Sequence, residues 1–329
     1  MQDIVPNNCS GKDKISNSGK VVLYGSTGVI GKTDFASYKK NIVLVARVGA
    51  NAGQLQIGNA PCGVTDNTLV IDAKEWNYYI YYFLQHYNLN RLVFGSGQPL
   101  ITGGMLKKIK VGHGNKVERI KITRLLCLLD KRIATQNKII EDLKKLKSAI
   151  SERLFKSVKG SIVLLSDICD IVKGKQINGE NLSERGRYYV MNGGTEPSGY
   201  YSDYNVEANT ISISEGGNSC GYVQFNTFPF WSGGHCYSIQ NVTGNVDNLY
   251  LYHYLKSNED NIMKLRIGSG LPNIQKKDLA MFKIIVPTLE QQMTISTFLS
   301  SIERKAQIEA DILIAMQSEK QHLLRQMFI

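Results

Sequence analysis

The sequence is short of the features that mark membrane, secreted and disulfide-rich proteins. The chain has 329 residues and contains no apolar run of eighteen residues, so we expect no membrane-spanning helix. The opening segment MQDIVPNNCSGKDK has no apolar stretch of the kind found in signal peptides. The cysteines form no C-x-x-C pair, which argues against a disulfide framework and predicts a reducing, cytoplasmic environment. They are Cys9, Cys62, Cys127, Cys169, Cys220 and Cys236.

Acidic residues are also scarce relative to basic ones. The chain has 28 aspartates and glutamates against 39 lysines and arginines, which leaves a formal charge of +11. A charge of this size favours a polyanionic partner, and we prefer DNA or RNA over a charge that serves only solubility. The hydrophobic fraction of 43% and the charged fraction of 20% are ordinary for a globular protein.

The chain contains two copies of one unit. The segment Gly95-Ser96-Gly97-Gln98-Pro99-Leu100-Ile101 recurs as Gly268-Ser269-Gly270-Leu271-Pro272-Asn273-Ile274, at a spacing of 173 residues. That spacing needs no gap as far as Phe155 and Phe328. Upstream, matching positions such as Gly49 and Gly217 lie 168 apart, which places a five-residue insertion between Ile239 and Gly268. Such register indicates duplication of a globular part followed by a helical part.

Both helical parts carry a narrow apolar stripe with steps of three and four residues. Polar residues interrupt the stripe at matching places, Gln136 and Lys147 in the first copy and Glu309 and Lys320 in the second. This pattern is typical of a coiled-coil seam whose polar positions select one register. The predicted seam consists of Leu129, Ile133, Gln136, Ile140, Leu143, Lys147, Ile150 and Leu154, and of Ile302, Ala306, Glu309, Leu313, Met316, Lys320, Leu323 and Met327.

We expect the two helices to pair antiparallel, because the stripe is narrower than the face by which a helix packs on a globular core. The alternative is that each helix packs on its own globular part. At ~1.5 Å per residue, a continuous helix over residues 118–155 would be nearly 60 Å long, unless it breaks near Asp130, or near Glu303 in the second copy. Aspartate at Leu143 and Leu146 should open the pair.

The start signals of the two helices differ. In the second copy Pro287 marks a boundary, and Thr288 with Gln291 forms a capping-box pattern. In the first copy Gly114 replaces the proline, which is a weaker signal.

The globular parts are predicted to be mixed and mostly β. Residues 41–48 and 209–214 are typical of strands, and residues 75–85 and 248–256 are typical of helices. We therefore expect an α+β fold with two such domains at the ends of an antiparallel two-helix coiled coil and an approximate two-fold axis. The expected boundaries are 1–112 and 158–287 for the globular domains, and 113–157 and 288–329 for the helical regions. The first domain has only Asp3-Ile4-Val5 to match Asp170-Ile171-Val172, and it lacks the opening segment that starts near Ser161.

Three motifs resemble catalytic or metal-binding sites, but their spacing or their absence from the other copy argues against each of them. Residues 25–33, GSTGVIGKT, have one residue too many between glycines for a phosphate-binding loop, and the second copy lacks the lysine. Asp72-Ala73-Lys74 resembles part of a nuclease metal site, but the second copy has Gln240-Asn241-Val242 there. Cys220, His235 and Cys236 have poor spacing for zinc. We therefore expect no catalytic residue, no metal and no cofactor in this chain.

The pattern of a globular domain, a long helix and the same again resembles the specificity subunit of type I restriction–modification enzymes. The Gly-Ser-Gly-x-Pro-x-Ile segments at Gly95 and Gly268 carry the resemblance, with Val286-Pro287-Thr288-Leu289-Glu290-Gln291. The segment 192–200, NGGTEPSGY, and the helices ending at Phe155 and Phe328 also match, so the likeness covers nearly the whole chain.

The resemblance implies a function in phage defence. Each target-recognition domain would read one half of a bipartite double-stranded DNA site, and the helices would set the spacer and dock two methyltransferase subunits. S-adenosylmethionine, ATP and Mg²⁺ would be held by those methyltransferase subunits and by restriction subunits. Alternatives are a specificity subunit of a methylation-only or phage-defence system without restriction, or a non-catalytic coiled-coil scaffold with two ligand-binding ends.

Candidate DNA-contacting residues lie on predicted turns and near the Gly-Ser-Gly segments, where polar side chains could reach bases or phosphates. In the first domain they are Ser26, Thr27, Lys32, Arg47, Asn51, Asn67, Gln98, Lys107 and Lys108. In the second they are Thr195, Ser198, Tyr200, Tyr201, Asn218, Ser219, His235, Asn273, Lys276 and Lys277. The four lysines at 107, 108, 276 and 277 are predicted to contact phosphate rather than bases.

Overall fold

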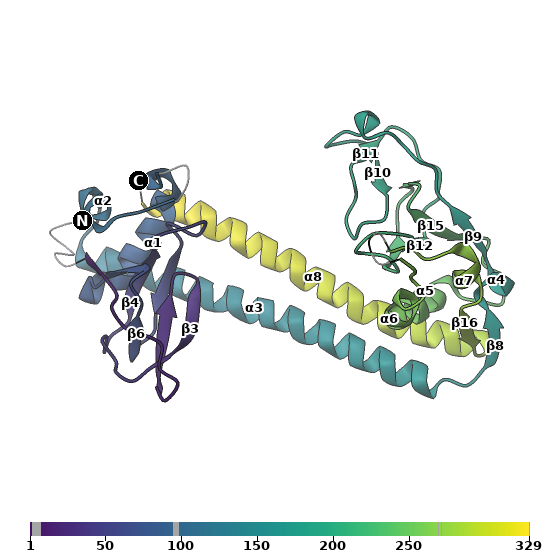
Figure 1. Ribbon diagram of the computed structural model, residues 1–329, viewed down its shortest axis with the longest axis horizontal. Coiled ribbons are helices and arrows are strands. Elements are labelled where there is room, and N and C mark those ends of the chain that lie inside the picture. Colours follow the sequence, from purple (N-terminus) through teal and green to yellow (C-terminus); the bar gives the residue numbers. More distant parts are fainter. Residues whose placement is uncertain (2–7, 95–98, 269, 271, 329) are drawn as a thin grey trace. The chain divides into compact units, whose positions relative to one another are not determined.

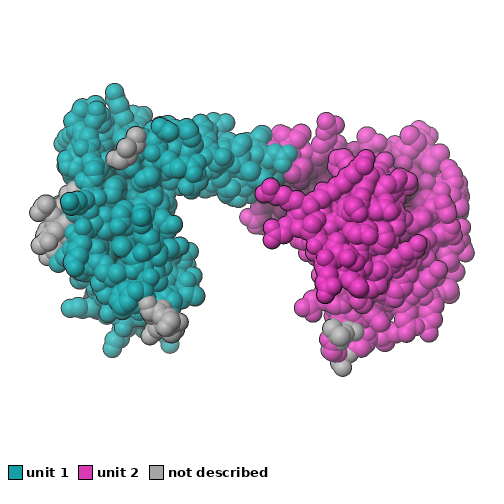
Figure 2. Space-filling view, turned by 90° about the horizontal axis from the view of Figure 1, so that it is seen from above, with its two compact units in different colours: residues 1–138, 310–329 teal, residues 139–309 magenta. Residues whose placement is uncertain are grey.

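The computed structural model describes residues 1, 8–94, 99–268, 270 and 272–328 (Figure 1). The chain divides into two compact units, residues 1–138 with 310–329 and residues 139–309 (Figure 2). Each unit combines one globular part with a segment of both long helices, α3 (Lys116–Ser157) and α8 (Leu289–Met327). None of the described helices is long and apolar enough to cross a membrane.

The globular part of the first unit is built on two small sheets. The larger sheet has the strand order β1-β7-β4-β5, and the smaller has the order β3-β2-β6, in which β2 and β6 are parallel. The strands are β1 (Asn8–Ser10), β2 (Val21–Gly25), β3 (Gly28–Thr33), β4 (Ile42–Ala46), β5 (Leu55–Gly58), β6 (Cys62–Val64) and β7 (Thr68–Ile71). The helices are η1 (Lys74–Trp76), α1 (Asn77–Tyr87), η2 (Leu89–Leu92) and α2 (Gly103–Lys108).

The second unit repeats this topology. Its larger sheet has the order β9-β15-β12-β13, and its smaller sheet, β11-β10-β14, again contains one parallel pair. The strands are β8 (Ser161–Leu164), β9 (Asp170–Lys173), β10 (Tyr188–Met191), β11 (Tyr200–Tyr201), β12 (Thr210–Ser214), β13 (Val223–Asn226), β14 (Trp231–Ser232), β15 (Cys236–Gln240) and β16 (Lys283–Val286). The helices are α4 (Leu165–Ile168), η3 (Gly179–Asn181), α5 (Asn248–Ser257), α6 (Glu259–Met263) and α7 (Lys276–Ala280).

Strand register shows that the larger sheets are equivalent residue by residue. Val43 pairs with Ile71 in the first sheet, and Ile211 pairs with Ile239 in the second, each 168 positions later. The α+β fold and the internal duplication are therefore confirmed. The five-residue insertion is shared between two loops, because Tyr79 and Phe83 of α1 correspond to Tyr250 and Tyr254 of α5 at a spacing of 171.

The apparent loss of the opening strand in the first copy is partly an error of alignment. β1 pairs with β7 as β9 pairs with β15, which sets Ser10, opposite Leu69, against Lys173, opposite Tyr237. The equivalent of β9 is therefore Asn8–Ser10. Asp3-Ile4-Val5, which we had aligned with Asp170-Ile171-Val172, lies outside the described residues. The pair β8–β16 of the second unit has no counterpart among the described residues of the first.

Within each unit the segments of α3 and α8 run antiparallel. In the first unit Asp130 of α3 pairs with Lys320 of α8, while Leu126, earlier in α3, shares a core with Leu324, later in α8. Both helices continue without interruption past Asp130 and Glu303, where we had considered a break. The predicted seam residues are all buried or half-buried, and most residues between them are exposed. Leu146 is 51% exposed, so our expectation that it contributes to the pairing is wrong.

Each globular core is completed by the end of the helix that belongs to the other copy. Phe328, which directly follows α8, packs on α1, with its ring 5.2 Å from that of Tyr79 and 5.9 Å from that of Phe83. Phe155 of α3 packs on α5 in the same way, with ring distances of 5.7 Å to Tyr250 and 5.2 Å to Tyr254. The alternative in which each helix packs only on its own globular part is therefore wrong.

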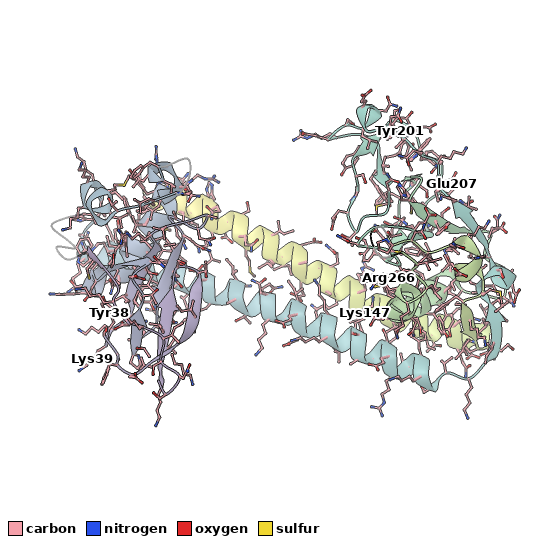
Figure 3. All side chains as sticks on the ribbon, in the orientation of Figure 1. Tyr38, Lys39, Lys147, Tyr201, Glu207 and Arg266 are labelled. Atoms are coloured by element: carbon pink, nitrogen blue, oxygen red, sulfur yellow. The ribbon has the colours of Figure 1, made fainter. Side chains whose placement is uncertain are left out.

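A charged triad joins the helices to the globular part in each unit. Lys320 and Asp130 lie 2.6 Å apart, and the Tyr82 hydroxyl donates to Asp130 at 2.8 Å. In the second unit Lys147, labelled in Figure 3, lies 2.9 Å from Glu303, and the Tyr252 hydroxyl donates to Glu303 at 3.0 Å. Burial and the adjacent carboxylate raise the pKa of both tyrosines, so the hydroxyls remain donors.

The first long helix begins with a capping signal that we did not predict. Asn115 and Glu118 cap each other: the Glu118 amide donates to Asn115 Oδ1 at 3.0 Å, and the Asn115 amide donates to Glu118 Oε2 at 2.9 Å. This reciprocal capping box uses asparagine where we had searched for a proline boundary. In the second copy the Gln291 amide donates to Thr288 Oγ1 at 3.4 Å.

Leu143→Asp is expected to destabilise the chain by about 2–3 kcal/mol, because it places a charge in the half-buried seam. Leu146→Asp, three residues on and exposed, is the matched control and should cost little. Urea unfolding of the purified variants measures both. Equal losses would contradict the assignment of the seam.

A buried histidine predicts a pH dependence of stability. His253 on α5 is 2% exposed, and its Nε2 lies 2.9 Å from Ser300 Oγ of α8. Burial, and then the nearby charge of Lys147, lower its pKa to about 4. Between pH 6.5 and 4 the unfolded ring takes up a proton that the folded ring does not. The free energy of unfolding therefore decreases as the pH is lowered through this range, by up to about 3 kcal/mol.

His253→Gln should remove this part of the pH dependence, because glutamine does not titrate. The free energy of unfolding is measured in urea at pH 7 and pH 5, with the exposed His322→Gln as control. The same difference between the two pH values in His253→Gln and the parent chain would refute the assignment.

Candidate nucleic-acid interface

In the second unit, loops from distant parts of the sequence meet at one edge of the larger sheet. The Glu215 amide donates to the His235 carbonyl at 2.9 Å, and the Ile274 amide donates to the Glu215 carbonyl at 2.8 Å. The His235 amide donates to Asn192 Oδ1 at 3.0 Å. We call the part of this edge formed by residues 215–221, 235 and 272–274 the second recognition edge.

The first unit has the same edge with the same backbone hydrogen bonds. The Arg47 amide donates to the Asn67 carbonyl at 3.0 Å, and the Ile101 amide donates to the Arg47 carbonyl at 2.9 Å. The first recognition edge therefore consists of residues 47–53, 67 and 99–101. Two glycines shape the turn in each copy, Gly49 (φ 80°) with Gly53 (φ 91°) and Gly217 (φ 75°) with Gly221 (φ 92°), because side chains rarely adopt such angles.

The structure brings seven of the predicted DNA-contacting residues to these two edges. They are Arg47, Asn51 and Asn67 in the first unit, and Asn218, Ser219, His235 and Asn273 in the second, all of them exposed or half-buried. Gln98 lies outside the described residues. Short polar side chains on a rigid turn, next to cationic ones, are suited to hydrogen bonding with base edges.

The other predicted residues lie elsewhere in their units. Ser26 and Thr27 form the β2–β3 turn, which contacts β5 through the bond from Gln56 Nε2 to the Gly25 carbonyl at 2.6 Å. Lys32 is exposed on β3. The lysines predicted for phosphate, Lys107, Lys108, Lys276 and Lys277, lie on the short helices α2 and α7.

In the second unit a separate group lies on and around the smaller sheet. Thr195 and Ser198 are exposed in the β10–β11 loop. Tyr200 and Tyr201 form β11, and the Tyr201 ring contacts that of Trp231 at 5.1 Å (Figure 3). The part with β10 and β11 projects away from the helices of this unit (Figure 1). These residues are not part of the recognition edge.

Sequence reasoning missed three residues at, or directly beside, the two edges. Ser10, Lys173 and Glu215 occupy the strand ends next to residues that we had named. Glu215 was within reach of the sequence, because it lies 168 positions after Arg47, which we had selected. Ser10 and Lys173 were hidden by the incorrect alignment of the first strand.

The segments that resembled catalytic motifs have unrelated structures. Residues 25–33 form a hairpin between β2 and β3 rather than a loop that leads into a helix. At Asp72 the carboxylate accepts a hydrogen bond from the Lys74 amide at 3.1 Å, which is a local turn. In the described part of the chain, histidine, cysteine, aspartate and glutamate nowhere gather in threes suited to a metal ion.

The two units are therefore equivalent domains, each with the same backbone frame and exposed polar side chains at one sheet edge. The sequence matches the model of the family described as type I restriction modification DNA specificity domain twice, over residues 3–145 and 160–317, and the chain belongs to this family. It is therefore a specificity subunit of the type I restriction–modification class, as its sequence pattern predicted.

Related proteins agree with this assignment. A protein of Mycoplasma genitalium named as a type I specificity subunit is 24% identical over 296 residues, covering 83% of this chain and 77% of the relative. The type I restriction enzyme MjaVIII specificity subunit of Methanocaldococcus jannaschii is 24% identical over 327 residues, covering 82% and 74%. The crystal structure of a type I S subunit from M. genitalium shares the fold, with a TM-score of 0.75, 19% identity and coverage of 98% and 93%.

Proposed function

We propose that each recognition edge reads one half of a bipartite double-stranded DNA site, and that this chain contributes recognition without catalysis. The observation that carries the proposal is the duplicated edge: the same backbone frame occurs in both units, with different polar side chains on it. A formal charge of +11 supports a nucleic-acid partner, because lysine and arginine neutralise phosphates.

The proposal assigns the chemistry to partner subunits in the cytoplasm. Two methyltransferase subunits would bring S-adenosylmethionine, and restriction subunits would bring ATP and Mg²⁺. The helices would set the spacer between the half-sites and dock the methyltransferases.

Exposed apolar residues at equivalent positions of the two long helices support the docking of two partners. Leu125 and Phe298 are 44% and 48% exposed, and Ile139 and Ile312 are 39% and 38% exposed. Each pair is separated by 173 residues, the spacing of the repeat. An exposed helix face is normally polar, and apolar residues that recur in both copies favour a protein partner over chance exposure.

Two other functions make different predictions. A specificity subunit of a methylation-only or phage-defence system would bind DNA in the same way, and only its partners would differ. A scaffold with two ligand-binding ends would show no salt-dependent DNA binding, whereas phosphate contacts make binding fall steeply with salt.

Methylome sequencing tests the function directly. Cells that carry this chain with its neighbouring methyltransferase are expected to methylate a split motif, and the motif should vanish when the chain is deleted. Replacing residues 161–285 with another recognition domain should change one half of the motif only. A change in both halves, or no chain-dependent motif, would contradict the proposal.

Docking is tested with charges at the repeated apolar positions. Native mass spectrometry should show two methyltransferase subunits on the parent chain, and one on Leu125→Asp or on Phe298→Asp, because a charge prevents burial of that position. Thr135→Asp, on an exposed polar position of α3, is the control. Two subunits bound to both single variants would refute docking at these positions.

A further inference from the structure

Three residues occupy the same places at, or directly beside, both recognition edges, with different chemistry. They are Ser10, Arg47 and Asn67 in the first unit and Lys173, Glu215 and His235 in the second, and we call each set an edge node. Their equivalence follows from strand register and from the shared backbone bonds at positions 47 and 215. The frame is preserved while the central residue changes from a cation to an anion.

The first node presents hydrogen-bond donors. Arg47 Nη1 donates to Ser10 Oγ at 3.2 Å, which holds the half-buried guanidinium at the edge. Asn67 is exposed beside it. A guanidinium has several donors and no acceptor, and its geometry matches the N7 and O6 acceptors of guanine.

The second node contains a buried carboxylate that is only half satisfied. Glu215 is 7% exposed, and its Oε1 accepts from Lys173 Nζ at 2.7 Å and from the Tyr237 hydroxyl at 3.0 Å. Its Oε2 is buried and accepts no hydrogen bond, and His235 Nδ1 lies 4.0 Å away. The side chains of Lys173 and His235 are 55% and 63% exposed.

The buried and unpaired Oε2 of Glu215 is placed to orient the histidine. A small movement of the exposed ring brings Nδ1–H to Glu215 Oε2, which satisfies a carboxylate oxygen that is costly to leave unpaired. With its Nδ1 hydrogen committed in this way, the neutral ring has Nε2 as an acceptor. An acceptor at this place is complementary to the exocyclic amino group of adenine or cytosine in the major groove.

We propose that the two edge nodes determine one base of each half-site, with Arg47 reading guanine and His235 reading an amino-bearing base. Glu215 is a positioning residue that acts through His235, and Lys173 contacts phosphate. This inference rests on the proposed function and adds the residues that make the two half-sites differ.

The first test exchanges the exposed residue of the second node. His235→Asn installs the residue of the first node at a solvent-exposed position, so the fold is retained. In methylome sequencing with the neighbouring methyltransferase, discrimination at one base pair of the second half-site should fall about tenfold or more. The first half-site should stay unchanged, and His322→Asn on α8 is the matched control. If the His235→Asn variant directs methylation of the same motif as the parent chain, with the same efficiency, the role of His235 is overturned.

The second test separates positioning from structural support. Glu215→Gln should alter the same base pair as His235→Asn, because an amide facing Nδ1 favours the tautomer that donates from Nε2. Arg47→Lys should relax the specificity at one base pair of the first half-site only, because lysine keeps the positive charge but cannot form the bidentate hydrogen bonds of a guanidinium. Lys173→Ala should weaken binding to all DNA sequences equally. It should also lower the steepness of the plot of log affinity against log salt concentration by about one.

The outcomes distinguish this inference from the function on which it rests. If the parent chain directs methylation of no split motif, the proposed function is overturned, and the inference with it. If the parent chain directs methylation of a split motif, and the node variants have a lower melting temperature but methylate the same motif, the inference alone is overturned.

Discussion

The structure depends on an exchange of anchors between the two copies. Phe328 ends the helix of the second copy and packs in the core of the first, and Phe155 ends the helix of the first and packs in the core of the second. Each anchor lies on two aromatic rings one helical turn apart, on α1 or on α5. Neither globular core is complete with the residues of its own copy, because each contains a phenylalanine from the helix of the other copy.

The charged triads explain why the helices meet in one register. A lysine inside an apolar seam is unfavourable unless a carboxylate and further donors surround it. Lys147 finds Glu303 and Tyr252, and Lys320 finds Asp130 and Tyr82. A shift by one helical turn would leave these charges unpaired, and so the polar positions select the register that also seats the phenylalanine anchors.

At the recognition edges the backbone forms a constant frame, and the side chains differ between the two copies. Turn glycines and backbone hydrogen bonds recur in both copies, which keeps the frame constant. Arg47 and Glu215 stand at the same place in that frame with opposite charge, which changes what the edge can bind. A duplicated fold can thereby recognise two different targets with one geometry.

Much of this fold was predictable from the sequence, because a duplication constrains every position twice. The repeat spacing, the seam pattern and the strands near residues 41–48 and 209–214 led to the correct fold class and family. Ser10 and Lys173 were not found, because short strands carry little signal and a shift of a few residues in β1 hid their equivalence. Glu215 could have been found from Arg47 by the repeat spacing. The exposure of Leu146 follows from the predicted seam, which passes through Leu143 and Lys147 and leaves Leu146 out.

Hydrogen exchange of the Phe328→Ala variant tests the exchange of anchors most directly. Removing this ring costs about 3–5 kcal/mol of packing in the core of the first copy. Amide protection should fall in α1 and β4 and stay unchanged in α5 and β12. Loss of protection in α5 and β12 instead, or in neither pair of elements, would contradict the account.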